Sequence, residues 1–197
     1  MEQNAEQQTR CGFVALIGAP NAGKSTITNN FVGSKVSIVS PKVQTTRTMV
    51  RGIGVYEQTQ IIFIDTPGIF KPKRRLDRAM VSSAWSGVKD ADIVVLVVDA
   101  KRGFDDETQS IVAKLNKQKI EAILVLNKVD LIAKEKLLGL SAQINAAGNF
   151  KETFMISALT GQNIEDFYKY FLIYLCRCYC VNYALCGYEI CLKLALG

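Results

Sequence analysis

Residues 18–25 read Gly-Ala-Pro-Asn-Ala-Gly-Lys-Ser, a G-x-x-x-x-G-K-S pattern that is typical of a loop around nucleotide phosphates. The pattern follows the apolar run 13–17, which predicts a buried strand, and it precedes a stretch that predicts a helix. Gly18 and Gly23 would let backbone N–H groups converge on a β-phosphate with no Cβ in the way. The helix N-terminus would add the positive end of its dipole.

The polar side chains that close this stretch supply its chemistry. Lys24 is predicted to reach the β- and γ-phosphates, and the Ser25 hydroxyl to bind Mg²⁺. The alternative, a glycine turn before a helix with no ligand, does not account for the lysine and serine at this spacing. The residues assigned to the phosphates are Gly18, Ala19, Pro20, Asn21, Ala22, Gly23, Lys24, Ser25 and Thr26.

A second candidate, Asp65-Thr66-Pro67-Gly68, ends the apolar run 61–64. A carboxylate at a strand end beside the cradle could hold Mg²⁺ through a bound water, and the glycine would let a backbone N–H approach the γ-phosphate. An Asp-x-x-Gly pattern by itself is a common turn. All four residues are assigned to the nucleotide site because of the other motifs along the chain.

Asn127-Lys128-Val129-Asp130 follows the apolar run 123–126 and indicates a guanine base. The Asp130 carboxylate is an acceptor only, and it could take hydrogen bonds from guanine N1–H and the exocyclic N2 amine. Adenine offers no such pair of donors, so the carboxylate would stay unpaired against it, at a cost of a few kcal/mol. The stem of Lys128 could lie over the base, and the Asn127 amide could tie this loop to the phosphate loop.

Ser157-Ala158-Leu159 completes the set after the run 153–156. The backbone N–H of Ala158 would donate to guanine O6. A tripeptide of this composition carries no weight alone, and it counts here because it ends a predicted strand downstream of the other motifs.

The order of these motifs predicts the fold that brings them together. Each follows an apolar strand, and in an open parallel sheet such strand ends lie along one edge, where ligands bind. Alternating strands and helices predict an α/β fold with a mainly parallel sheet, helices on both faces and one antiparallel edge strand from a hairpin that turns at 57–59. The expected strands are 12–18, 49–56, 60–65, 93–98, 122–126 and 153–156, and the expected helices are 24–32, 76–88, 105–117, 134–146 and one from 164.

With these motifs the chain resembles small bacterial GTPases of the translation-factor-related class, and among them the Era family. The resemblance is carried by residues 18–26, 43–47 and 65–74. The Der family of tandem GTPases shares the Pro-Asn phosphate loop, but the stretches 44–47 and 71–73 favour Era. The resemblance implies a P-loop NTPase G domain over residues 10–175 that binds GTP and GDP and hydrolyses GTP.

The resemblance also implies in-line attack of water on the γ-phosphate, with Mg²⁺ and Lys24 offsetting the charge. The implied catalytic residues are Lys24, Thr46 and Gly68. The implied Mg²⁺ ligands are Ser25, Thr46 and, through water, Asp65, with Thr45 as the alternative to Thr46. Ile69 stands where Ras-like enzymes have a glutamine that orients the water, so intrinsic turnover is expected to be slow.

Two interpretations of Asn21 remain open. Related GTPases with an asparagine at this place can hold a monovalent cation, which here would be K⁺, beside the β- and γ-phosphates. Such a cation would sit where an arginine finger places its charge. Alternatively, Asn21 stabilises the phosphate loop through local hydrogen bonds.

The composition is that of one globular domain with a positive charge. The chain has 197 residues, of which 49% are hydrophobic, and its net charge is +6 with a pI near 9.0. It contains no histidine, which excludes catalysis and metal binding by histidine. A positive chain attracts RNA or acidic membrane surfaces. A basic cluster follows the Asp-x-x-Gly motif, and this position favours a partner-facing role over a solvated face. The cluster comprises Lys71, Lys73, Arg74, Arg75 and Arg78.

Location and partners are expected as follows. Residues 1–9 are polar and predict a disordered lead-in without a signal peptide, so a cytoplasmic location is expected. The Era resemblance implies the small ribosomal subunit and its rRNA as partners, a peripheral association with the inner membrane, and a monomeric state.

The tail, residues 176–197, departs from this pattern because it contains five of the six cysteines. Its C-x-C-x-C spacing is a poor zinc site, its charges interrupt a membrane span, and disulfides conflict with a cytoplasmic location. Era-like proteins continue into an RNA-binding KH domain, which the tail does not resemble. We therefore expect a truncated or frame-shifted gene, and the alternative function is a remnant that binds GTP and GDP but lacks RNA binding and activity in ribosome assembly.

Overall fold

The computed structural model of this chain describes residues 10–34, 50–56, 59–66, 68–69, 81, 84–89 and 91–179. Some predictions fall outside these ranges and stay predictions. They concern the lead-in 1–9, Thr45 and Thr46, Pro67, the basic cluster within 71–78, and the chain from residue 180.

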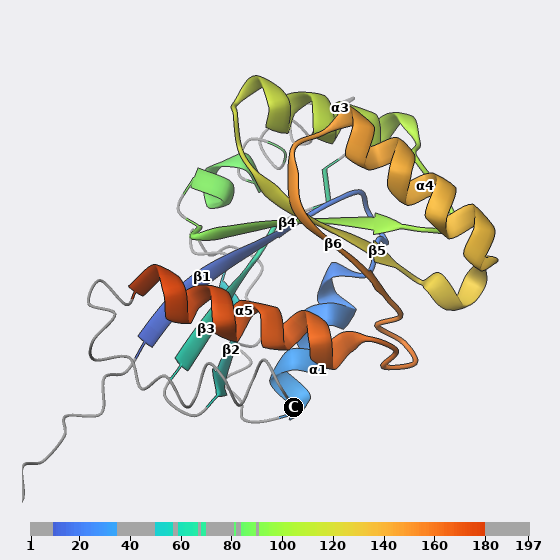
Figure 1. The fold of residues 1–197 in the computed structure, drawn as a ribbon. Helices are drawn as coiled ribbons and strands as arrows, with labels where there is room; N and C mark the ends of the chain where they lie inside the picture. The colour runs from blue at the N-terminus through green and yellow to red at the C-terminus, as the bar shows by residue number, and fades with distance from the viewer. Residues whose placement is uncertain are drawn as a thin grey trace, which may run out of the picture.

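One mixed sheet of six strands forms the centre of the molecule, in the order β2-β3-β1-β4-β5-β6 (Figure 1). Every neighbouring pair is parallel except β2 and β3, which pair antiparallel at one edge. The bounds are Arg10–Ile17 for β1, Val50–Tyr56 for β2, Thr59–Asp65 for β3, Ile93–Asp99 for β4, Ala122–Asn127 for β5 and Phe150–Ile156 for β6. The predicted α/β fold with its antiparallel edge strand is confirmed.

Helices alternate with the parallel strands. The bounds are Lys24–Ser34 for α1, Asp106–Lys117 for α3, Lys134–Ala147 for α4 and Ile164–Tyr179 for α5, with a 3₁₀ turn η1 at Val129–Leu131. Residues 84–89 are also helical and belong to the predicted helix 76–88. Within the described ranges, no helix combines the length and the apolar character that crossing a bilayer requires.

The helices cover both faces of the sheet and enclose two apolar cores (Figure 1). α1 and α5 pack on one face of the sheet through aromatic rings. The ring centroid of Phe31 lies 4.7 Å from that of Phe63 and 4.4 Å from that of Tyr168. α3, α4 and residues 84–89 pack on the other face through mainly aliphatic side chains. All of β4 is buried, because it lies between β1 and β5 and under helices on both faces.

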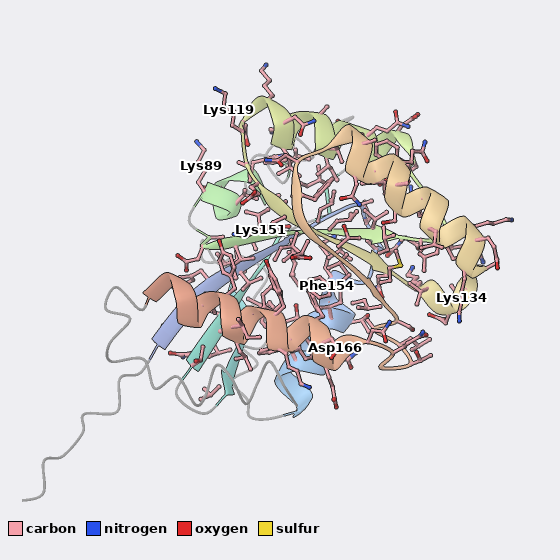
Figure 2. All side chains as sticks on the ribbon, in the orientation of Figure 1. Lys89, Lys119, Lys134, Lys151, Phe154 and Asp166 are labelled. Carbon is pink, nitrogen blue, oxygen red and sulfur yellow. The ribbon has the colours of Figure 1, made fainter. Side chains whose placement is uncertain are left out.

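Charged side chains lie on the outside of these layers. Figure 2 shows Lys89, Lys119 and Lys134 pointing away from the body of the molecule, and all three residues are exposed. The buried side chains of α3 and α5 face the sheet and belong to its two apolar cores.

Most element bounds differ from the predicted ones by one or two residues, and three differences have a clear structural basis. β6 begins at Phe150 rather than at residue 153, because its first residues pair with β5 although Lys151 and Glu152 are exposed and interrupt the apolar run. Tyr56 pairs with Thr59, so β3 begins at Thr59 rather than at residue 60, inside the predicted turn 57–59. The backbone of α5 remains helical to Tyr179, four residues past the predicted domain boundary at 175.

Candidate nucleotide-binding site

The phosphate loop connects β1 to α1, and its two glycines are required by the surrounding protein. Gly18 has φ 151°, and a Cβ there would lie 2.2 Å from the carbonyl oxygen of Val97. Gly23 has φ 100°, and a Cβ there would lie 2.1 Å from Nδ2 of Asn127. Both glycines were predicted to make room for a phosphate. The structure adds that any side chain at either position would collide with β4 or with the end of β5.

The carbonyl oxygens of the phosphate loop accept hydrogen bonds from side chains of the protein. Lys24, which is 7% exposed, donates from Nζ to the carbonyls of Gly18 at 3.0 Å and Ala19 at 2.9 Å. The next three carbonyls accept from later elements: Pro20 from Nη1 of Arg102 at 3.4 Å, Asn21 from Nζ of Lys128 at 2.8 Å, and Ala22 from Nδ2 of Asn127 at 2.8 Å. These bonds fix the shape of the loop before any ligand binds.

The loop after β3 packs directly on the phosphate loop. β3 ends at Asp65, which pairs with Leu16 of β1, so the two strand ends lie side by side. A Cβ on Gly68 would lie 2.9 Å from the backbone of Pro20, so the glycine is needed for this close approach. The N–H of Ile69 donates to the carbonyl of Gly18 at 2.9 Å. The predicted meeting of the two motifs is therefore present.

Two residues of this loop serve the protein interior. Thr66 was assigned to the nucleotide, but it is 1% exposed and its Oγ1 donates to the carbonyl of Leu16 at 2.7 Å, so it holds the loop against β1. Ile69 is 6% exposed and belongs to the apolar core with Ile64 and Trp85. Its side chain is thus directed into the core, and what it offers to the phosphate loop is its backbone N–H.

Asn127 joins the phosphate loop and the Ser-Ala loop to the end of β5. It is the last residue of β5, and its side chain is 2% exposed. Its Nδ2 donates to Ala22 in the phosphate loop, and its Oδ1 accepts the N–H of Ala158 at 3.0 Å. The predicted tie to the phosphate loop is present, and a second tie to the Ser-Ala loop accompanies it.

The loop after β6 is bonded to the end of β5 and to α1. The N–H of Ala158 was assigned to guanine O6, but in this structure it donates to Asn127, so a base would have to share it. The carbonyl of Ala158 accepts from Nδ2 of Asn30 on α1. Ser157 is fully buried, and its Oγ accepts the N–H of Thr160 at 3.2 Å, so it stabilises the turn. Leu159 is exposed at the rim.

The guanine motif places the side chains of Asn127 and Lys128 on the phosphate loop and leaves Asp130 exposed. Lys128 has φ 64°, and its Nζ donates to the carbonyl of Asn21 and to Oδ2 of Asp99 at 2.6 Å. Its stem was predicted to lie over the base, and the structure adds that both ends of the side chain are fixed. Asp130 is exposed in η1, where its carboxylate is available to a base.

The motif search missed Asp99, Arg102 and Asn30. Asp99 carried a usable signal, because it ends the apolar run of β4 in the same way that Asp65 ends β3. Arg102 lies in the loop that follows β4, and its sequence context does not distinguish it from any other exposed charged residue. Asn30 faces the Ser-Ala loop only because α1 and β6 meet in space, so no local pattern could have identified it.

The residues present fit a bound Mg²⁺. Ser25 and Thr26 are exposed in the first turn of α1, directly after the phosphate loop, and Mg²⁺ takes oxygen ligands such as hydroxyl groups. No group of three or more acidic, cysteine or histidine side chains that could hold a metal occurs among the residues that the structure describes.

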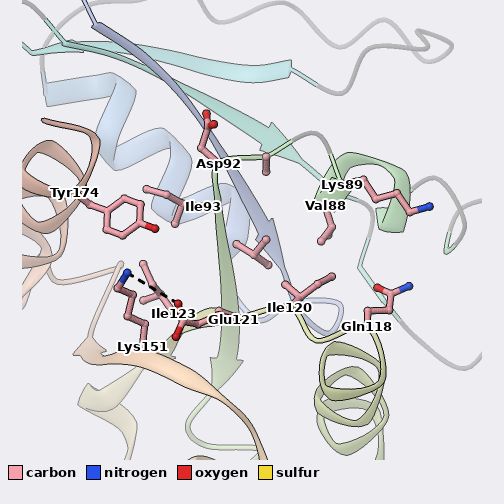
Figure 3. A pocket seen from close by; sticks show the side chains of 13 residues that line it. Val88, Lys89, Asp92, Ile93, Gln118, Ile120, Glu121, Ile123, Lys151 and Tyr174 are labelled. Carbon is pink, nitrogen blue, oxygen red and sulfur yellow. Dashed lines mark ion pairs between the residues drawn. The ribbon is translucent and has the colours of Figure 1, made fainter. Parts of the chain in front are cut away.

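A separate cavity of about 510 Å³ opens at the opposite edge of the sheet (Figure 3). The starts of β4 and β5, the end of α3 and Tyr174 of α5 line it. Figure 3 shows Lys151 between Glu121 and Tyr174, with Nζ at 4.0 Å from the carboxylate and 4.5 Å from the ring centroid. This cavity has no glycine loop and no helix N-terminus, so it is not the predicted phosphate site.

The chain is similar to known GTPases. Residues 13–128 match the family model of the 50S ribosome-binding GTPases. The chain is 62% identical over 166 residues to the GTPase Era of Bradyrhizobium sp. (strain ORS 278), a match that covers 84% of this chain and 54% of that protein.

Solved structures agree. The structure of Era in complex with MgGDPNP and nucleotides 1506–1542 of 16S ribosomal RNA is 38% identical, with a TM-score of 0.70, and the match covers 83% of this chain and 56% of that one. An Aquifex aeolicus Era variant bound to GDP and AlF4⁻ is also 38% identical, with a TM-score of 0.69 and the same coverage. The chain spans about half the length of the relatives it matches.

Proposed function

The chain belongs to the Era family of GTPases, and on that premise we propose that it binds GTP and GDP and hydrolyses GTP as a switch in the assembly of the small ribosomal subunit. The observation that carries the proposal is the double tie of Asn127, which holds the phosphate loop and the Ser-Ala loop beside the guanine motif. All the strand-end motifs therefore serve one ligand of the size of a guanine nucleotide.

The roles in hydrolysis follow from the positions of these residues. Lys24 lies inside the phosphate loop, where its ammonium would move from carbonyl partners towards the β- and γ-phosphates. Gly68 lies against Pro20 of the phosphate loop, which supports its proposed role of donating a backbone N–H to the γ-phosphate. Mg²⁺, held by Ser25, Thr46 and the water-linked Asp65, would neutralise charge on the phosphates.

Turnover is expected to be slow because the residue directly after Gly68 is apolar. Ile69 is buried in the core and cannot orient a water molecule. The function is tested by titrating purified protein with GTP, GDP and ATP and by measuring phosphate release. Lys24→Ala is the loss-of-binding control. Equal affinity for ATP and GTP, or phosphate release from GTP equal to that of the control, would refute the proposal.

We also propose that Asn21 makes hydrolysis dependent on K⁺. Asn21 is exposed in the phosphate loop with φ 63°, a backbone conformation that asparagine tolerates better than most residues. The carbonyl of Asn21 is already held by Lys128, which leaves the side chain as the cation ligand to be tested. Hydrolysis should be faster in potassium than in sodium buffer at matched ionic strength, and equal rates would assign Asn21 to loop geometry alone.

Partners and location are proposed from the family and the charge. We place the chain in the cytoplasm as a monomer that contacts the small-subunit rRNA, with peripheral contact to the inner membrane. The net charge of +6 supports attraction to both polyanionic surfaces. Residues 1–197 alone should bind rRNA weakly and without sequence preference, with affinity that falls steeply as salt increases. Titration of 3′-end oligonucleotides against scrambled ones tests this, and tight discriminating binding would refute it.

A further inference from the structure

We propose that Asp99 is a positioning residue of the nucleotide site and that it acts through Lys128. The proposal rests on the proposed binding of guanine nucleotides and adds a residue to that site. Asp99 ends β4, the strand between β1 and β5, and it is 9% exposed. Its Oδ2 lies 2.6 Å from Nζ of Lys128, a distance typical of a short, charge-assisted hydrogen bond.

Lys128 transmits this contact to the phosphate loop. Its Nζ also donates to the carbonyl of Asn21 at 2.8 Å, so one ammonium group bridges β4 and the loop. A lysine ammonium has three donors on a flexible stem. Here two of them are directed at fixed acceptors, which gives an otherwise mobile side chain one position. The bridge Asp99–Lys128–Asn21 therefore joins the ends of β4 and β5 to the phosphate loop.

The carboxylate of Asp99 is itself held in place. Its Oδ1 accepts the backbone N–H of Lys101 at 2.9 Å and that of Arg102 at 3.4 Å. Both carboxylate oxygens thus have partners in the protein, and the turn after β4 sets their direction. Such a supported carboxylate can orient a neighbouring cation, because its own position costs no further ordering.

The bridge has a consequence for the chemistry of the site. A nucleotide brings several negative charges next to Lys128, and a mobile ammonium would follow them as a point charge. The buried carboxylate keeps the ammonium on Asn21 instead, so Lys128 stabilises the loop. Loss of the bridge should therefore speed the dissociation of GDP and GTP alike. It should leave the choice of base unchanged, because that choice depends on Asp130.

Arg102 makes a second and weaker contact of this kind. Its guanidinium donates to the carbonyl of Pro20 at 3.4 Å and pairs with Asp105 at 2.7 Å and Glu107 at 3.0 Å. The side chain is 43% exposed, so solvent screens these pairs. Arg102→Ala should accordingly change nucleotide dissociation much less than Asp99→Asn does.

The experiment is a double-mutant cycle with Asp99→Asn, Lys128→Met and the double variant. Asparagine keeps the size of the side chain and an acceptor oxygen, and methionine keeps the apolar stem of lysine without its charge. Dissociation of fluorescent GDP and GTP analogues is measured by displacement, and each single variant should dissociate about ten- to a hundred-fold faster, as expected for a lost charge-assisted hydrogen bond. The double variant should be no faster than Lys128→Met, with an unchanged preference for guanine over xanthine nucleotides.

The matched control is Glu121→Gln, the same loss of charge at the opposite edge of the sheet, where the partner lies at 4.0 Å. Dissociation rates for Asp99→Asn within twofold of this control, or effects that add in the double variant, would overturn the proposal. Thermal unfolding of the nucleotide-free variants gives a second cycle. If the unaltered chain binds no guanine nucleotide, the proposed function fails by itself, and coupling or its absence in this second cycle still decides whether the bridge exists.

Discussion

The two edges of the sheet treat polar side chains in opposite ways. At the carboxyl edge, Asn127, Thr66 and Lys24 are all less than 9% exposed, and each bonds to the backbone of another strand or of the phosphate loop. At the amino edge, Lys151 and Glu121 are exposed and lie 4.0 Å apart beside an open cavity. A buried polar group that loses its partner costs far more than a screened surface pair does.

Cys11 lies near the start of β1, at the amino edge. Burial raises the pKa of the Cys11 thiol, and the nearby charge of Asp92 raises it further. A thiol with a raised pKa stays protonated at neutral pH and is a poor nucleophile and metal ligand. The comparison thus separates an edge built to hold a ligand from an edge built to close the fold.

The largest expected effect is that of Gly23→Ala. The new Cβ would lie 2.1 Å from Nδ2 of Asn127 on a backbone with φ 100°, so both the loop and its main anchor must move. Nucleotide binding should fall below detection by calorimetry. Gly139→Ala is the control, because a Cβ there meets nothing within 4 Å and alanine favours the α4 helix by about 1 kcal/mol. Affinity equal to that of the control would contradict the assigned role of Gly23.

Asp130→Asn should weaken GTP by about a hundred-fold or more, because a site built around hydrogen bonds discriminates strongly against a mismatched edge. The affinity for xanthosine triphosphate should rise, since its base presents a carbonyl where guanine has its amine. Competition binding with both nucleotides measures the exchange. Unchanged GTP affinity would show that another residue contacts the base. Because Asp130 is exposed, a loss of GTP affinity would not be explained by misfolding.

Asn127→Ala should lower the free energy of unfolding by about 3 kcal/mol even without nucleotide, since the hydrogen bonds to Ala22 and Ala158 are both buried. Urea denaturation measures the loss. The control is Asn145→Ala on α4, whose amide bonds to Thr153 at the surface. Equal destabilisation by the two variants would show that burial at the carboxyl edge has no special weight.

The smallest effect belongs to the amino edge. Glu121→Gln should change the free energy of unfolding by less than about 0.5 kcal/mol, because its pair with Lys151 is long and solvent-screened. The same urea titration detects it, in low and in physiological salt. A loss comparable with that of Asn127→Ala would remove the contrast between the two edges.

Predictions from local sequence patterns were correct where the residues that define an element or loop are contiguous in the sequence. β4 is a nearly pure valine run that reads as a central strand, and the phosphate loop follows β1 with its glycines at the predicted positions. The start of β6 was misplaced because Lys151 and Glu152 look like loop residues, while their backbone pairs with β5. Strand pairing depends on the neighbouring strand, which a window along one segment does not contain.

By itself, the amino-acid sequence determined which groups could contact a nucleotide and in which order the strands present them. Glycine, lysine, asparagine and aspartate at fixed spacings have few other uses, and a parallel sheet puts their strand ends on one edge. Only the tertiary structure decided how those groups are held. Thr66 turned inward onto Leu16, Ala158 bonded to Asn127, and Asp99 became the partner of Lys128, because each of these contacts joins elements far apart in the sequence and depends on their packing in three dimensions.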